Sequence, residues 1–588
     1  MKKTIAMLLA VAMSLSLAAC GGKTDKPADA AHLTVCLASE PDTIDPALNS
    51  AIDGASMLVH LFSGLAKWSQ NEDGTLSITP DAAEELTEGV INADGTVTYT
   101  YTLRDGMKWS DGEPVTAADF EFAWKRASSE SLGSDYGYMF DVIKGYPNDL
   151  AVTAKDDKTL EVILNNELRY WDELLAFPTY FPVREDVVAD EAWATEPETY
   201  ICNGPYTITG WEHNSVITLE KNPNYIDADS ITMDKIEFFL SDDNNNMLTN
   251  FQNGSWLMID DVPVNEIANL KVNYPEEFVV AGQLGTYYVS WNINENLLPA
   301  DSTLTGVEAE AAEAEIRNAL GMLLDRNYIV EKIAQGGQVP ASSFISKGFV
   351  DADGTDFSDN AGGNDFAGYF DTSAEAFENN YNTAIEILKK YYTFDETAQK
   401  FTNAPTLTYI YNTNDNHKAI AEYFQGAWAP LGINIQLQNQ EWNTFLNTRK
   451  SGNYSIARNG WVADYTDPTC YVDMWITKSG NNDVQFGKGE HKDLAMYDLD
   501  LTALGYDIKV EDGTWAETYD VLVSTLKTET DNDKRMQMMH MAEDLVMETG
   551  CITPVYFYTD LYMLDDSVKG FYCSPLGFKY FMYTTIEG

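Results

Sequence analysis

Residues 405–458, "PTLTYIYNTNDNHKAIAEYFQGAWAPLGINIQLQNQEWNTFLNTRKSGNYSIAR", alternate between strand and helix patterns. The β-rich run "PTLTYIY" precedes a helical pattern over 416–430, which Pro430 and Gly432 close. A second strand ("INIQLQ"), a second helix ("EWNTFLNTRK") and a third strand ("YSIAR") follow. Strand, helix, strand, helix, strand within about fifty residues predicts an α/β fold whose parallel sheet is covered by helices.

The segment after the third strand, "NGWVADYTDPTC" (459–470), places a carboxylate among aromatic residues. Ligands of parallel sheets bind in the crevice outside the carboxyl ends of the strands, so Asp464 lies at the edge where a ligand is expected. A carboxylate in apolar surroundings needs a cation, and no obvious cation follows within the loop. We therefore expect the cation to come from a ligand. The alternative is an aspartate that only forms a turn.

Elements outside this region also follow from local patterns. "TVTYTYTLR" (96–104) alternates as a strand does, and Thr116 is the expected N-cap of a helix that buries Phe120 and Trp124. Residues 314–334 predict one amphipathic helix ending before Gly336. The side chains expected to face inward are Ile316, Leu320, Leu323 and Leu324.

Two polar segments, 297–315 and 351–370, are expected to be surface excursions. The second is rich in Asp, Asn and Gly, which invites a calcium-site interpretation. It lacks the order of an EF-hand, with no Gly at the sixth position and no terminal Glu. A solvated loop is the favoured interpretation.

The first residues predict export. Lys2 and Lys3 precede an apolar run (5–17), and "LAAC" ends at Cys20. The apolar run is too short to span a bilayer, so 1–19 is expected to be a signal peptide. "LAAC" also resembles the bacterial lipobox, in which the cysteine becomes the lipidated N-terminus. The polar residues 20–31 are then expected to form a tether.

Composition limits the function classes. The 588 residues carry a net charge of −55, which disfavours nucleic-acid binding. Signatures such as GxSxG, HExxH, Walker A and the Rossmann glycines are missing from the sequence, and the six histidines are too dispersed for metal spacing. We therefore expect neither an enzyme nor a metal or cofactor site. Apart from Cys20, the sequence has five cysteines, an odd number, and they are scattered along the chain. This argues against a disulfide framework but leaves a Cys551–Cys573 pair open.

Several stretches together resemble the oligopeptide-binding (family 5) solute-binding proteins of bacterial ABC importers. They run in family order over almost the whole mature chain, and the block at 103–120 is highly specific. The stretches are "SEPDTIDP" (39–46), "LFSGL" (61–65), "LRDGMKWSDGEPVTAADF" (103–120), "NGPYTITGW" (203–211), "LEKNPNYID" (219–227), "GTYYVSWN" (285–292), "IRNALGMLLDRNYIVEKI" (316–333), "NQEWNTFLNTR" (439–449), "ARNGWVADYTDP" (457–468) and "PVYFYT" (554–559).

The resemblance implies a periplasmic-binding-protein-like fold with two main lobes and an extra lobe. Lobes I and III are expected to close on a ligand by hinge motion near 284 and 558. The implied boundaries are 32–66, 197–284 and 558–588 for lobe I, 67–196 for lobe II, and 285–557 for lobe III.

The resemblance also implies the ligand-binding residues. In the relatives, the acid of the W-x-A-D-Y motif binds the peptide α-ammonium, and that residue is Asp464 here. Trp461 and Trp442 are implied as aromatic walls, and the extended "NGWVAD" segment can pair with the peptide backbone. The cations implied to meet the peptide carboxylate are Arg458, Arg449 and His417. Tyr287 and Tyr288 are implied to lie on the cleft side of the lobe crossing.

Each of these residues also has a structural interpretation from the sequence alone. The tryptophans suit an ordinary core. Arg458 has many acids to pair with, and Arg449 suits the C-terminal end of a helix. His417, next to Lys418, suits the surface.

The sequence departs from the family at three positions in the cleft. Val289 replaces an expected aromatic residue, Ser290 follows where an acid is common, and Gly54 stands where a close relative carries an acid, although Asp53 adjoins it. The middle of the cleft is therefore expected to differ in charge and shape.

We interpret the chain as an exported, lipid-anchored, monomeric receptor that captures short peptides and delivers them to an ABC permease. It contacts the membrane through its N-terminal lipid only. An alternative function within the same fold is that of a receptor for an oligosaccharide, a nickel complex or haem. An alternative from another functional class is a secreted hydrolase or an adhesin.

Overall fold

The computed structural model describes residues 31–587. The predicted signal peptide, the predicted lipidation site Cys20 and nearly all of the predicted tether lie outside these residues. Within them, no helix combines the length and apolar character that a membrane span requires.

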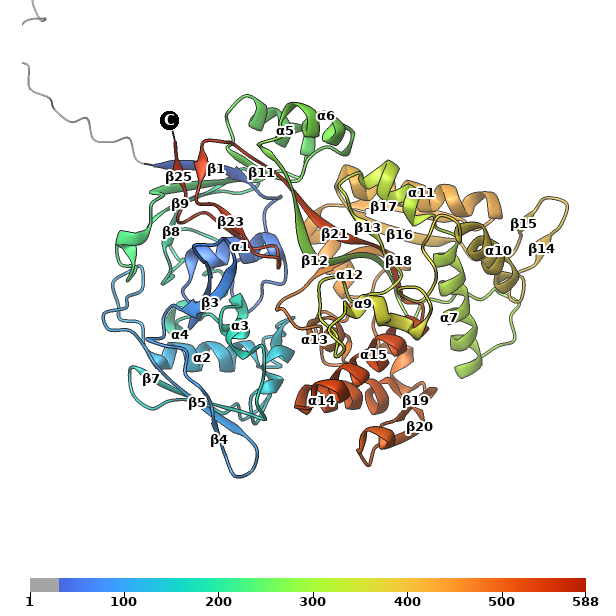
Figure 1. The fold of residues 1–588 in the computed structure, drawn as a ribbon, viewed down its shortest axis with the longest axis horizontal. Coiled ribbons are helices and arrows are strands. Elements are labelled where there is room, and N and C mark those ends of the chain that lie inside the picture. The colour runs from blue at the N-terminus through green and yellow to red at the C-terminus, as the bar shows by residue number, and fades with distance from the viewer. Residues whose placement is uncertain (1–30, 588) are drawn as a thin grey trace, which may run out of the picture.

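An eleven-stranded mixed sheet runs through the molecule (Figure 1). Its main path is β17-β16-β18-β12-β21-β11-β1-β10-β9-β8, and β13 pairs with β21. The bounds in that order are Ile435–Gln440, Leu407–Asn412, Ile456–Val462, Phe278–Trp291, Ile552–Leu564, Met258–Asp260, His32–Cys36, Lys235–Phe239, Val216–Lys221 and Tyr206–Glu212, with Val339–Pro340 for β13.

The parallel sheet predicted from 405–458 is confirmed. β16 pairs in parallel with both β17 and β18. The connecting helices are α11 (Asp415–Trp428) and α12 (Trp442–Lys450). Their N-caps Asn414 and Glu441 each accept bonds from two backbone N–H groups of the first turn, which explains why the chain becomes helical directly after each strand. β18 continues to Val462, so Asp464 follows its end by two residues.

A separate four-stranded sheet occupies the blue and cyan part of the chain in Figure 1. Its order is β4 (Val90–Ile91), β5 (Val97–Thr102), β7 (Thr159–Leu164) and β6 (Val152–Ala154). Helix α2 (Ala117–Ala127) begins in a capping box of Thr116 and Asp119, and it buries Phe120 and Trp124 as predicted.

Two long strands join the two sides of the molecule. β12 and β21 pair antiparallel along nearly their whole lengths (Figure 1). Their register shifts between Gly282 and Thr286. β21 is central, because it lies between β12 and β11.

The single helix predicted over 314–334 is wrong in its limits. Helix α7 spans Val307–Met322, and α8 (Arg326–Tyr328) and a π-helix (Ile329–Ala334) follow a break. The break is stabilised because Asp325 caps the backbone N–H of Tyr328. The buried Arg326 guanidinium donates to the carbonyl of Gly321 at 2.9 Å, which satisfies a group at the end of α7. The four side chains predicted to face inward are all buried.

The two expected surface excursions also contain packed structure. In the first, α7 begins at Val307 because 307–315 is rich in Ala and Glu, and buried Glu310 forms an ion pair with buried Arg317. In the second, Phe357 is fully buried and its ring stacks on His540 with centroids 3.9 Å apart. The described chain contains no cluster of side chains suited to a metal ion.

The cysteines form no disulfide among residues 31–587. Cys36, Cys202, Cys470, Cys551 and Cys573 are all free, so the Cys551–Cys573 pair that the sequence left open does not form.

Candidate functional site

A cavity of about 380 Å³ lies at the carboxyl ends of β16, β17 and β18. Its walls come from separate parts of the chain, including 49–56, 177–178, 412–414, 458–464 and 576–579. This is the edge of a parallel sheet at which ligands bind, and the volume suits a small organic ligand.

Asp464 is a buried acid in this cavity with one free oxygen. The residue is 6% exposed, and its Oδ1 accepts a hydrogen bond from the Tyr136 hydroxyl at 2.8 Å. Its Oδ2 is buried and has no hydrogen-bond partner among residues 31–587. Burial raises the pKa of Asp464 well above its ordinary value, and Asp473 adds to the rise while the Tyr136 hydrogen bond opposes it. The free oxygen thus faces a site where an incoming cation is strongly favoured.

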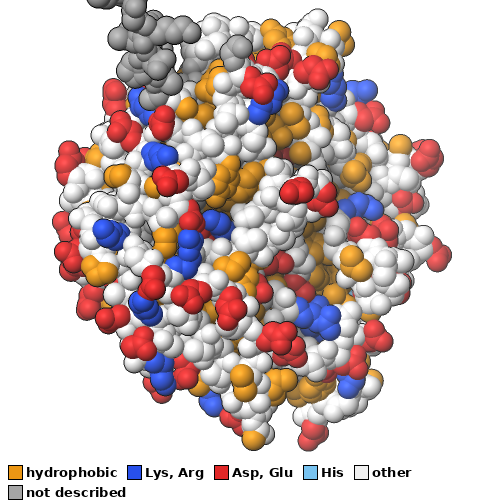
Figure 2. Space-filling view, turned by 60° about the vertical axis from the view of Figure 1, so that its left-hand side comes forward, with side chains coloured by type: hydrophobic (Ala, Val, Ile, Leu, Met, Phe, Trp, Pro, Cys, Tyr) orange, Lys and Arg blue, Asp and Glu red, His pale blue; other side chains and the backbone are white. Residues whose placement is uncertain are grey.

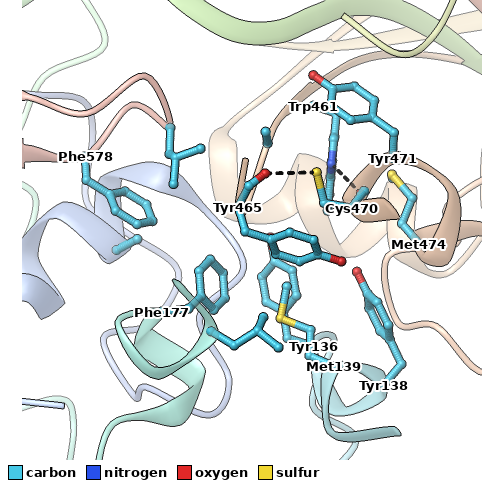
Figure 3. Close-up of a cluster of buried hydrophobic side chains, with 14 of the residues drawn as sticks. Tyr136, Tyr138, Met139, Phe177, Trp461, Tyr465, Cys470, Tyr471, Met474 and Phe578 are labelled. Carbon is cyan, nitrogen blue, oxygen red and sulfur yellow. Dashed lines mark hydrogen bonds between the residues drawn. The ribbon is translucent and has the colours of Figure 1, made fainter. Parts of the chain in front are cut away.

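Aromatic side chains from several parts of the chain pack together around Tyr136 (Figure 3), whose hydroxyl is the hydrogen-bond donor to Asp464. The Trp461 ring lies 6.3 Å from the ring of Tyr136, which packs edge-on against Phe177 at 5.1 Å. The ring of Phe177 in turn lies 6.2 Å from the ring of Phe578, measured between their centroids. The Trp461 indole N–H donates to the carbonyl of Cys470 at 3.0 Å, which fixes the ring. The predicted aromatic wall at Trp461 therefore lines the cavity.

Arg458 is a cation without a carboxylate partner. It lies on β18, and no acid of the described chain lies within ion-pair distance of it. Its guanidinium lies 5.4 Å from the centre of the Tyr287 ring, and Nη2 lies 3.4 Å from the Tyr558 hydroxyl. The aromatic contacts hold the cation without neutralising it, so it remains available to an anion.

Arg449 and Trp442, two of the implied ligand-binding residues, also line the cavity. The Arg449 guanidinium, however, lies 2.7 Å from Oδ2 of Asp483, so its charge is already compensated. Trp442 begins α12, packs on Phe445 and has a buried indole N–H with no partner in the described chain.

Three predicted ligand residues do not line the cavity. Tyr287 and Tyr288 are fully buried in β12, and His417 lies on α11 with its Nδ1 3.4 Å from the Tyr287 hydroxyl. Burial, followed by the charge of Arg458, lowers the pKa of His417 well below its ordinary value, so the imidazole is neutral. Tyr287 and His417 thus lie behind Arg458 as support. The expectation of a surface position for His417 is wrong, because that face of α11 packs against β12.

Sequence reasoning missed Tyr136 and Phe177. Tyr136 is 328 residues from Asp464 in sequence, and neither residue belongs to a motif with chemical meaning by itself. Only the assembled fold brings them together.

The mixed α/β fold, with several lobes and a ligand-sized cavity between them, is that of a periplasmic-binding-protein-like receptor. The chain belongs to the bacterial extracellular solute-binding proteins of family 5, because the family model for the middle region matches residues 77–483.

Among its relatives is the oligopeptide-binding protein OppA of Bacillus subtilis, which is 32% identical and aligns over 99% of this chain and 98% of the relative. Among solved structures, Haemophilus influenzae OppA in complex with the peptide RPPGFSPFR matches with a TM-score of 0.77 and 25% identity, covering 95% of this chain and 99% of that one. The unliganded open form of the murein tripeptide-binding protein MppA matches with a TM-score of only 0.57 at 25% identity, covering 95% and 98%. The present structure is therefore closer in shape to the peptide complex than to that open form.

Proposed function

We propose that this receptor captures short peptides outside the cell and delivers them to an ABC transporter permease. The observation that carries the proposal is a pair of opposite, uncompensated charges in one cavity, at Asp464 and Arg458. A peptide presents an ammonium group and a carboxylate at its two ends, and each charge meets its complement here. The relatives described above, which are an oligopeptide-binding protein, a complex with a peptide and a murein tripeptide-binding protein, support the same ligand class.

The binding role includes a hinge. Ligand contacts on both sides of the cavity favour the closed state, since a ligand shifts an equilibrium only through its differential affinity. The register break between β12 and β21 supports the hinge expected near 284 and 558, where the chain passes between lobes. We infer that the protein binds its ligand without chemical turnover and acts as a monomer. The lipobox resemblance implies that it is anchored through lipid at Cys20.

The experiment that tests the proposal is native mass spectrometry of protein that lacks the signal peptide, purified from a peptide-rich host. We expect co-purified peptides of a narrow length range. An empty protein with no thermal shift on addition of mixed peptides, but with a shift on addition of sugars or nickel complexes, overturns the peptide assignment. If the protein hydrolyses members of a peptide library, the proposal that it is not an enzyme is overturned.

Tyr136→Phe should weaken peptide binding by about 0.5–1.5 kcal/mol, the usual range for one hydrogen bond. The Tyr136 hydroxyl opposes the rise in the pKa of Asp464, so its loss makes the carboxylate easier to protonate. The deficit should therefore grow as the pH of the titration falls. Isothermal titration at several pH values measures it.

The matched control is Tyr138→Phe. The Tyr138 hydroxyl is also buried but has no hydrogen-bond partner among residues 31–587. Equal losses in the two variants would show that the Tyr136 hydrogen bond has no role in binding.

A further inference from the structure

The charges that line the cavity do not balance after the internal ion pairs are formed. Arg449 pairs with Asp483, and Lys579 lies 2.9 Å from Asp260 and 3.1 Å from Asp560. Arg458 is the one lining cation of the described chain left without an acid. The lining acids outside these pairs are Asp53, Asp242, Asp261 and Asp464. On the face shown in Figure 2, acidic side chains are also more widespread than basic ones. A zwitterionic peptide neutralises Asp464 and Arg458 and leaves the excess negative charge in place.

Asp53 is the remaining acid with a free buried oxygen. It lies in the first turn of α1 (Ile52–Leu61), and its Oδ1 accepts a hydrogen bond from the Gly54 N–H at 2.9 Å. Its Oδ2 is buried and finds no hydrogen-bond partner within residues 31–587. The other two acids differ: Asp261 accepts bonds from Val262, Asn244 and Asn414, and Asp242 is exposed to solvent.

The backbone around Asp53 is fixed. A Cβ atom at Gly54 would lie 2.0 Å from Nδ2 of Asn49, so the start of α1 packs tightly on that side chain. Burial raises the pKa of Asp53 to about 6, and the neighbouring Asp42 adds to the rise, even though a helix N-terminus favours a negative charge. A fixed carboxylate with an elevated pKa is one that a bound cation stabilises.

An aromatic ring lies close to the same carboxylate. The Trp442 side chain comes from α12, on another part of the chain, and lines the same cavity as Asp53. Trp442 also opposes the rise in the pKa of Asp53. A carboxylate beside an indole is a favourable environment for an ammonium or guanidinium group, through ion pairing and cation–π attraction.

We propose that Asp53 binds a lysine or arginine side chain of the captured peptide, so that the receptor selects peptides carrying a cationic residue. This inference rests on the proposed peptide-binding function and adds a third charge contact to those at Asp464 and Arg458. Trp442 forms the wall against which the aliphatic part of the cationic side chain packs.

The test uses isothermal titration with matched tripeptides. Three peptides carry one lysine among alanines, at the first, second or third position. Three partners carry norleucine, which keeps the aliphatic chain and lacks the charge. The wild-type protein should bind the lysine peptide at least about tenfold more tightly than its norleucine partner at one position, as a desolvated charge pair predicts. In Asp53→Asn this ratio should fall to about one, while affinity for the norleucine peptide is retained.

Controls separate this inference from the function on which it rests. Asp242→Asn changes a lining acid that is exposed, so the lysine preference should persist. Asp53→Ser serves as a second variant if Asp53→Asn folds poorly. Two outcomes overturn the role of Asp53 but not the peptide-binding function. In the first, the wild-type protein binds the norleucine peptides and shows no preference for lysine. In the second, the lysine preference is unchanged in both Asp53 variants. A wild-type protein that binds none of the six peptides overturns the proposed function.

Discussion

Asp464→Asn should weaken peptide binding by about 2–5 kcal/mol, the range expected when one partner of a buried charge pair is removed. The asparagine keeps the size of the side chain and the acceptor for Tyr136, but it loses the charge that meets the ammonium group. N-acetylation of the peptide removes the same interaction from the other side. Isothermal titration of the free and the N-acetylated peptide against the wild type and the variant forms a double-mutant cycle. Acetylation should hardly change the affinity of the peptide for Asp464→Asn.

The same variant should leave the ligand-free protein as stable as the wild type or more stable at neutral pH. The folded-state pKa of Asp464 is raised, so the folded state binds more protons than the unfolded state above the ordinary pKa of 3.8. Stability therefore falls as pH rises from 3.8 through the raised pKa, and asparagine removes this loss. Thermal melts across pH measure it. A lower melting temperature for Asp464→Asn at pH 7.5 would indicate a structural role instead, as would unchanged affinity.

Arg458→Met should also cost about 2–5 kcal/mol of peptide affinity, because it removes the only lining cation of the described chain that lacks an acid partner. Methionine retains much of the aliphatic contact with the Tyr287 ring. Amidation of the peptide C-terminus should cause a similar loss in the wild type and little further loss in the variant. A variant that still discriminates strongly against the amide would place the peptide carboxylate elsewhere.

Arg449→Met provides the contrast in stability. It breaks the pair with Asp483 and leaves a carboxylate that is 6% exposed without its cation, which costs about 3–5 kcal/mol of folding stability for a buried pair. Arg458→Met breaks no ion pair and should change the melting temperature far less. Equal destabilisation by the two substitutions would contradict the assignment of different roles.

The elements that could be predicted from the sequence are those fixed by local pattern. The alternation over 405–458 determines three parallel strands and two capped helices, and the Thr116 cap lies where its motif indicates. The break after Met322 could not be predicted, because it depends on the buried Arg326 reaching carbonyls that only the folded chain places nearby.

The site divides in the same way. Asp464, Trp461 and Arg458 belong to one continuous strand and its following loop, so a single motif locates all three. Tyr136, Phe177 and Asp53 are isolated residues in distant parts of the sequence. They reach the cavity only because separate lobes meet there, and no local periodicity encodes that meeting. His417 is buried although its neighbour is Lys418, since adjacent positions of a helix face different directions.

The central position of β21 has a consequence for how the protein is made. The strand comes from residues 552–564, yet it lies between β12 and β11 and alone connects the two parts of the large sheet. Every other strand of that sheet precedes β21 in the sequence, so it leaves the ribosome before β21 does. The two parts of the large sheet therefore remain unjoined until residues 552–564 have been synthesised, so this sheet forms as a whole only near the end of translation.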